Sequence, residues 1–180
     1  IGLALLGIRQ KNIFFSLILL SISFGFAVNL KITSVFYMLP IFLLSLRRKS
    51  AWFHTTVICL SLLIMVLPFL YKNISFSNYL DFIRLAKNEQ MYFSLFHDCL
   101  KFLFLYYFIP TMLFLLYLSK HKEHLKHFFL KYKLPLISLF ACLAVVVIMG
   151  AKAGGGKLYM LPFMPLFVYF WSKLINIEFD

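Results

Sequence analysis

Two lysines flank three consecutive glycines in residues 150–166, which read GAKAGGGKLYMLPFMPL. Lys152 and Lys157 supply positive charge, and the glycines between them, Gly154, Gly155 and Gly156, let backbone N–H groups approach a ligand closely. We call residues 151–157 the glycine loop. Its composition predicts a site for an anion such as a phosphate, although it does not match the P-loop pattern of nucleotide-binding proteins. The alternative interpretation is a flexible hairpin between two membrane helices, with lysines that reach lipid headgroups.

The composition predicts that this loop lies in a membrane protein. Of the 180 residues, 63% are hydrophobic and 13% are charged, which indicates an all-α fold, a polytopic transmembrane helical bundle. The net charge of +12 is explained by basic loops beside anionic headgroups, so no nucleic-acid partner is predicted. The three cysteines are far apart and odd in number, which predicts no disulfide framework, and no metal or other cofactor is expected.

Apolar runs separated by short polar segments predict about six complete spans in a single transmembrane domain, residues 1–180. Residues 1–8 have the character of the last turns of a helix already under way, so we expect the chain to be a fragment of a longer protein. The predicted complete spans are residues 13–30, 32–46, 51–71, 100–118, 134–150 and 158–171.

The distribution of lysine and arginine predicts the orientation of the spans. The most basic connections, residues 47–49 and 119–133, fall on the same side of the membrane when spans alternate, and the positive-inside rule places that side in the cytoplasm. The turn at Lys31, the long polar loop of residues 72–98 and the glycine loop then share the outer side.

Two predicted spans are short, and each follows an outer-side lysine. Residues 32–46 make a helix of roughly 22 Å at about 1.5 Å per residue, against roughly 30 Å of hydrocarbon, and residues 158–171 are similar. Lys31 and Lys157 are therefore predicted to approach one another below the outer headgroup plane, in a recess lined by protein. If the predicted boundaries are off by a few residues, both lysines return to the interface.

The outer loop of residues 72–98 contains the pattern of an amphipathic helix. Ser77 or Asn78 is the predicted N-cap, and the helix is expected to lie on the outer leaflet. A solvated loop is the alternative. The residues predicted on its apolar face are Tyr79, Phe82, Ile83 and Ala86.

Two segments resemble a known enzyme superfamily. Residues 24–40, FGFAVNLKITSVFYMLP, resemble a span of bacterial GT-C glycosyltransferases with the pattern small–Asn/Ala–x–Lys–x–Ser/Thr followed by proline. Residues 151–165, AKAGGGKLYMLPFMP, resemble their Lys–x–Gly–Gly and Leu–Pro–x–x–Pro span. The resemblance implies the C-terminal membrane part of an enzyme of the bacterial inner membrane. Its partners would be a polyprenyl-phosphate-linked sugar and membrane lipids.

The resemblance also implies roles for individual residues. Cations beside the leaving phosphate would stabilise the transition state, and a carboxylate, expected outside this chain, would activate the acceptor hydroxyl. The chain alone is therefore expected to be inactive. The predicted donor-phosphate residues are Lys31, Lys152, Lys157 and Arg84. The predicted substrate-binding residues are Asn29, Tyr37, Gly154, Gly155, Gly156 and Tyr159.

Two other function classes use the same lysines. A carrier or flippase for an anionic lipid or solute would bind the anion without chemistry, although the sequence shows no repeated half typical of such proteins. A structural membrane subunit would use every lysine at the interface only. No sugar, acceptor or oligomeric state is predicted.

Overall fold

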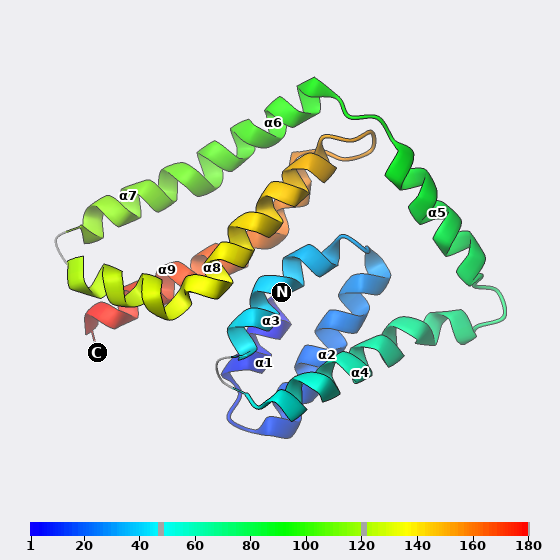
Figure 1. Cartoon of the computed structure of the whole chain (residues 1–180), viewed down its shortest axis with the longest axis horizontal. Helices are drawn as coiled ribbons and strands as arrows, with labels where there is room; N and C mark the ends of the chain where they lie inside the picture. The colour runs from blue at the N-terminus through cyan, green and yellow to red at the C-terminus, as the bar shows by residue number, and fades with distance from the viewer. Residues whose placement is uncertain (47–48, 120–121, 180) are drawn as a thin grey trace. The chain divides into compact units, whose positions relative to one another are not determined.

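The computed structural model describes residues 1–46, 49–119 and 122–179, and within these it consists of helices and their connections (Figure 1). The predicted all-α class is confirmed. The chain divides into two compact units, Ile1–Gln90 and Met91–Asp180, and each is described by itself. The single transmembrane domain stays a prediction.

Five helices in the described part of the chain are long and apolar enough to cross a membrane, which makes this a multi-pass membrane protein by composition. A shorter apolar helix, Ser34–Leu46, occupies the second predicted span. Three spans begin earlier than predicted, because helical structure continues through the polar residues that precede their apolar runs. The last span has 19 residues, so the prediction that it is short was wrong. The five long helices are Ile13–Leu30, Ala51–Leu70, Phe93–Leu116, Leu125–Gly150 and Lys157–Ile175.

The first unit is built on α2, which packs against α1 and α4 through small residues. Ser16 on α2 donates a hydrogen bond of 2.7 Å to the carbonyl of Gly7 on α1. Gly25 faces α4 so closely that a Cβ atom there would lie 2.6 Å from the Cβ of Ile64. The helices of this core are α1 (Gly2–Arg9), α2 (Ile13–Leu30), α3 (Ser34–Leu46) and α4 (Ala51–Val66).

A buried polar contact joins the end of α3 to the start of α4. The imidazole of His54 lies 2.9 Å from the hydroxyl of Ser45 on α3 through Nε2, and 2.7 Å from the carbonyl of Ser50 through Nδ1. Ser50 also caps α4, because its side chain accepts from the amide of Phe53. These contacts fix the start of α4 against the end of α3.

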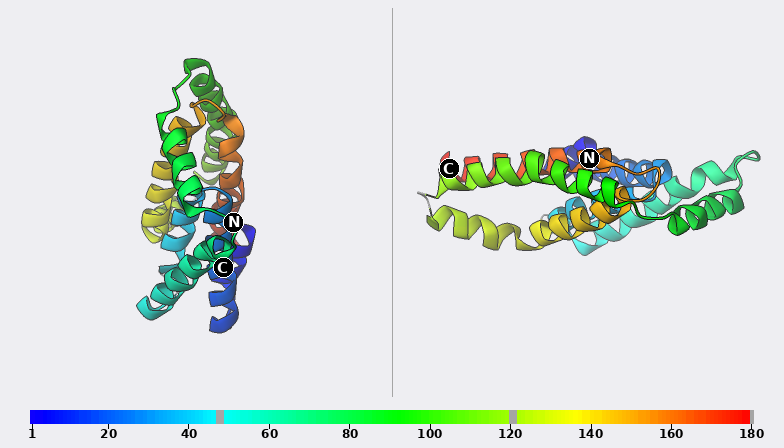
Figure 2. Two further views of the ribbon diagram at one scale, coloured as in Figure 1. Left: turned by 90° about the vertical axis from the view of Figure 1, so that its right-hand side faces the viewer. Right: turned by 90° about the horizontal axis from the view of Figure 1, so that it is seen from above.

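The predicted amphipathic helix is α5 (Phe76–Asn88), which follows the 3-10 helix η1 (Leu67–Leu70). Figure 2 shows the chain turning back between the two. The N-cap of α5 is Ser75, whose hydroxyl accepts a hydrogen bond from the amide of Asn78. The prediction of Ser77 or Asn78 as the cap was therefore wrong. The ring of Phe69 packs against Tyr79, while Phe82 is 68% exposed. The location of α5 on the outer leaflet stays a prediction.

In the second unit, helices α6, α8 and η3 contact one another around the glycine loop. Figure 1 shows α8 in yellow beside α9 in orange to red. α8 is bent at Tyr132, where φ is −109° and ψ is 16°, three residues before Pro135. The segments of this unit are α6 (Phe93–Leu103), the π-helix η2 (Phe104–Phe108), α7 (Ile109–Leu118), α8 (Lys122–Gly150), the 3-10 helix η3 (Lys157–Phe163) and α9 (Met164–Phe179).

We predict that Gly25→Ala destabilises the first unit, because the added Cβ overlaps Ile64 and lies 3.0 Å from the carbonyl of Ser61. The expected loss is about 1–3 kcal/mol in the free energy of unfolding, measured in mixed detergent and SDS micelles. Gly2→Ala is the matched control, because no atom lies within 4 Å of its added Cβ. Equal stability of the two variants would contradict this account of the α2–α4 contact.

We also predict that Phe82→Asp lifts α5 from a membrane surface, because the exposed ring then carries a charge. In proteoliposomes, protease should cleave this segment faster in Phe82→Asp than in the parent protein, with the apolar helices still inserted. Asn78→Asp, at another exposed position of α5, is the control and should change little. The same cleavage rate in both variants would favour a solvated helix.

Candidate functional site

The glycine loop is tied to helices at its first residues. The amide of Ala151 donates to the carbonyl of Val147 at 3.1 Å, so the hydrogen bonding of α8 continues past its last residue. The carbonyl of Ala151 accepts from the amide of Tyr92 at 2.8 Å, next to an antiparallel bridge between Met91 and Lys152. The start of the loop is therefore fixed by α8 and by the segment that leads into α6.

The three glycines are required for different reasons. Gly154 has φ of 72° and Gly156 has φ of 134°, conformations that side chains disfavour. Gly155 lies in a tight turn, where a Cβ atom would be 2.6 Å from the carbonyl oxygen of Gly150 and 2.8 Å from that of Lys152. Its own amide donates to the Lys152 carbonyl at 2.9 Å. The run of glycines thus produces one particular backbone shape.

This shape leaves several amide groups for a ligand. Within the described part of the chain, the N–H groups of Gly154, Gly156 and Lys157 donate no backbone hydrogen bond. Neighbouring amides such as those of Gly156 and Lys157, in a turn with positive φ at Gly154 and Gly156, form concavities that favour anions. Residues 150–166 contain no aspartate or glutamate that would repel an anion. The backbone and its charge surroundings therefore suit a phosphate.

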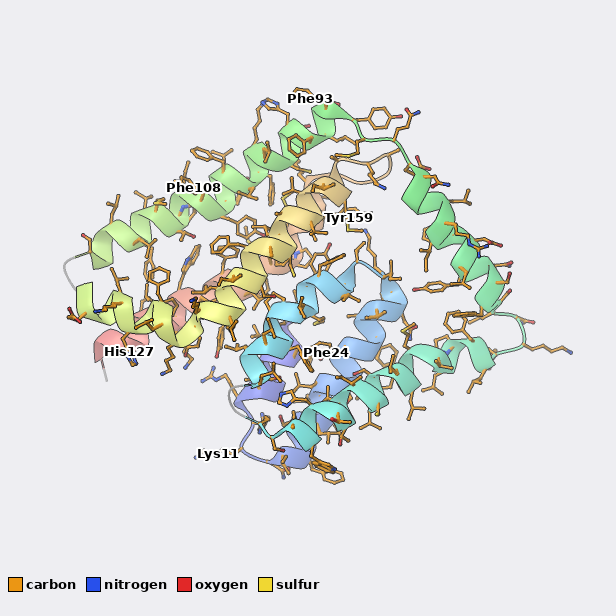
Figure 3. The ribbon with its side chains drawn as sticks, viewed as in Figure 1. Lys11, Phe24, Phe93, Phe108, His127 and Tyr159 are labelled. Carbon is orange, nitrogen blue, oxygen red and sulfur yellow. The ribbon has the colours of Figure 1, made fainter. Side chains whose placement is uncertain are left out.

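The loop residues with functional side chains have different exposures. Lys157 begins η3 and is exposed, and no described carboxylate lies within ion-pair distance of it. Lys152 is half-buried in the bridge with Met91. Tyr159 is half-buried, and its amide donates to the carbonyl of Gly156 at 3.1 Å (Figure 3). The two lysines, the glycines and the tyrosine are close together because they belong to one short segment of the chain.

The other predicted residues belong to the first unit. Lys31 is exposed at the C-cap of α2. Asn29 donates to the carbonyl of Ile64 on α4 at 3.0 Å, which ties the end of α2 to α4. Tyr37 is buried, with 6% of its surface exposed. The predicted recess shared by Lys31 and Lys157 joins residues of different units, so it stays a prediction.

Arg84, the fourth predicted phosphate residue, lies on α5. Its guanidinium is 3.1 Å from the carboxylate of Asp81, and both side chains are exposed. An exposed pair of this type is weak, so an anion can compete with Asp81 for the arginine. Its assignment to the donor phosphate also stays a prediction.

Sequence reasoning missed the residues that support the loop from α6 and η2. Cys99 lies against Gly150, where an added Cβ would be 3.0 Å from its sulfur. Tyr107 donates a hydrogen bond of 2.6 Å to the carbonyl of Met160 in η3. A proline three residues after Tyr107, Pro110, was the signal in the sequence that the helix there departs from α geometry. Among the described residues, no group of three His, Cys, Asp or Glu could hold a metal ion.

We predict that Gly155→Ala disrupts the glycine loop, because its Cβ overlaps two backbone carbonyls that cannot rotate away. The expected loss is about 2 kcal/mol in the stability of the loop, seen as faster amide hydrogen exchange of residues 151–159. Gly154→Asn is the matched control, because that position has open space and asparagine tolerates a positive φ. If the alanine variant exchanges as slowly as the asparagine variant, the tight turn described here is wrong.

Comparison with known proteins gives no relative from which a function could be transferred: no protein-family model, curated protein or solved structure matches the chain.

Proposed function

We propose that the chain is the membrane portion of a glycosyltransferase that uses a polyprenyl-phosphate-linked sugar at the outer face of the bacterial inner membrane. One observation carries the proposal: the glycine loop presents two lysines and unpaired amides, with no carboxylate in the segment. The likeness of residues 24–40 and 151–165 to GT-C spans supports it from the sequence.

The reaction breaks the bond between the anomeric carbon of the sugar and an oxygen of the lipid phosphate. The phosphate leaves with the bonding electrons, and the acceptor oxygen forms the new bond while its proton passes to a base. Negative charge therefore grows on the phosphate in the transition state, and nearby cations stabilise it. Lys152 and Lys157 serve this role as point charges, because an ammonium group does not bind phosphate in the bidentate manner of arginine.

The residues of the first unit have a place in the same proposal. The likeness of residues 24–40 to a GT-C span assigns Lys31, which is exposed on the C-cap of α2, to the donor phosphate. Asn29 contributes by holding this end of α2 to α4 through the Ile64 carbonyl, which limits where Lys31 can move. Arg84 can bind an anion once its guanidinium leaves the carboxylate of Asp81. The base that takes the proton of the acceptor hydroxyl would be a carboxylate, as the likeness to GT-C enzymes implies.

A carrier for an anionic lipid would bind the same phosphate and leave the sugar attached. The experiment must therefore follow both binding of the lipid phosphate and transfer of the sugar. The complete protein in proteoliposomes, with a labelled polyprenyl-phosphate sugar, provides both measurements.

We predict that Lys31→Met and Lys157→Met each lower transfer by about 10²-fold, because each removes roughly 2.7 kcal/mol of stabilisation from the leaving phosphate. Insertion should stay normal, since methionine keeps the apolar stem. Arginine at either position should restore activity only in part.

Lys72→Met is the control, because Lys72 is an exposed lysine of the predicted outer side without an assigned role. It should transfer at the parent rate. Full transfer by both the Lys31 and Lys157 variants would refute the proposal. Binding of the donor without any transfer by the complete protein would identify a carrier instead.

A further inference from the structure

We infer that Tyr107 is a positioning residue that holds η3, and with it Lys157, in the geometry that binds the anion. The part of this inference that concerns the anion rests on the proposed function. Tyr107 belongs to η2 and lies 53 positions before the residue it bonds, Met160. Only 2% of its surface is exposed, and its hydroxyl donates to the Met160 carbonyl at 2.6 Å.

The π-helix explains why Tyr107 reaches this position. Pro110 has no N–H, and the chain responds with a π turn in which the amide of Ile109 bonds the carbonyl of Phe104, five residues earlier. The extra residue in that turn rotates the side chains that follow. Continued from Cys99 and Phe102, α periodicity would bury residue 106.

The structure shows this shift directly. Tyr106 is 51% exposed, and the buried residue after Cys99 and Phe102 is Tyr107. Because of this single π turn, Tyr107 rather than Tyr106 is the tyrosine that contacts η3. Such turns often occur at functional sites, and here the turn delivers a hydroxyl to a specific carbonyl.

The acceptor is the Met160 carbonyl, which belongs to the 3-10 helix η3. In this 3-10 helix the amide of Met164 bonds the carbonyl of Leu161, so it does not bond Met160 as it would in an α-helix. The Met160 carbonyl is buried with its residue, and its two lone pairs allow it to accept the tyrosine hydroxyl in addition to a backbone amide of the 3-10 helix. The hydroxyl of Tyr107 bonds this carbonyl, and Met160 lies three residues after Lys157 in the chain.

The two ends of the glycine loop are thus attached to one continuous element. The Tyr92 amide fixes the first end through the Ala151 carbonyl at 2.8 Å, and Tyr107 fixes the second end through Met160. Both residues belong to the run from the start of α6 to η2. The loop between these attachments carries Lys152, Lys157 and the unpaired amides, so its shape is set before any anion arrives.

Tyr107→Phe tests the inference, because it removes only the hydroxyl and with it the hydrogen bond to the Met160 carbonyl. In lipid nanodiscs, the amides of Gly155 and Tyr159 should exchange about tenfold faster than in the parent chain, because a buried hydrogen bond near them is lost. Tyr106→Phe is the matched control, since that neighbouring ring is half exposed, and it should exchange at the parent rate.

A binding measurement with a polyprenyl phosphate in the same nanodiscs completes the test. Affinity should fall about tenfold in Tyr107→Phe, while Lys157→Met should lose affinity without faster exchange of Gly155 and Tyr159. Unchanged exchange in Tyr107→Phe would overturn the inference, and so would faster exchange with full affinity. If the parent chain does not bind the polyprenyl phosphate, the proposed function and the role toward the anion both fail, and the exchange data alone decide whether Tyr107 holds the loop.

Discussion

Hydrogen bonding of the backbone is the constraint on which this structure depends, because polar groups within or beside hydrocarbon must find partners. The glycine loop lies between two apolar helices, and the regular helical hydrogen bonds of the backbone stop within it. Its internal bond from Gly155 to Lys152 and the bond from Tyr92 satisfy part of the loop. Among the described residues, the amides of Gly154, Gly156 and Lys157 donate no backbone hydrogen bond, so they can bond water or an anion.

The same constraint shapes the helices around the loop. Pro110 removes a donor from the α6–α7 helix, and the π turn before it reorganises the bonds. In η3 the Met160 carbonyl also accepts a hydrogen bond from the hydroxyl of Tyr107. In the first unit, side chains reach backbone carbonyls of neighbouring helices, as Ser16 does at Gly7 and Asn29 at Ile64. These bonds join helices whose apolar surfaces alone would not select one neighbour in a membrane.

The composition was sufficient to predict the class of fold. The positions where apolar runs are interrupted predicted the turn at Lys31 and the glycine loop. Helix ends were harder to predict. Phe93 begins α6 seven residues before the predicted span, because a helix continues through polar residues once it has formed. Ser75 rather than Ser77 caps α5, since several nearby polar residues could serve as the cap. Tyr107 was missed because one π turn shifts the helical phase, and periodicity assumes a constant phase.

The central claim is that the lysines of this chain contact a lipid phosphate. Solid-state NMR can measure it directly, through the dipolar coupling between nitrogen-15 at lysine Nζ and phosphorus-31 of a polyprenyl phosphate reconstituted with the protein. The account predicts a coupling that is weakened by Lys31→Met and by Lys157→Met and is unchanged by Lys72→Met. A spectrum without lysine–phosphorus coupling, or with a coupling that both of the first two variants retain in full, would contradict the account.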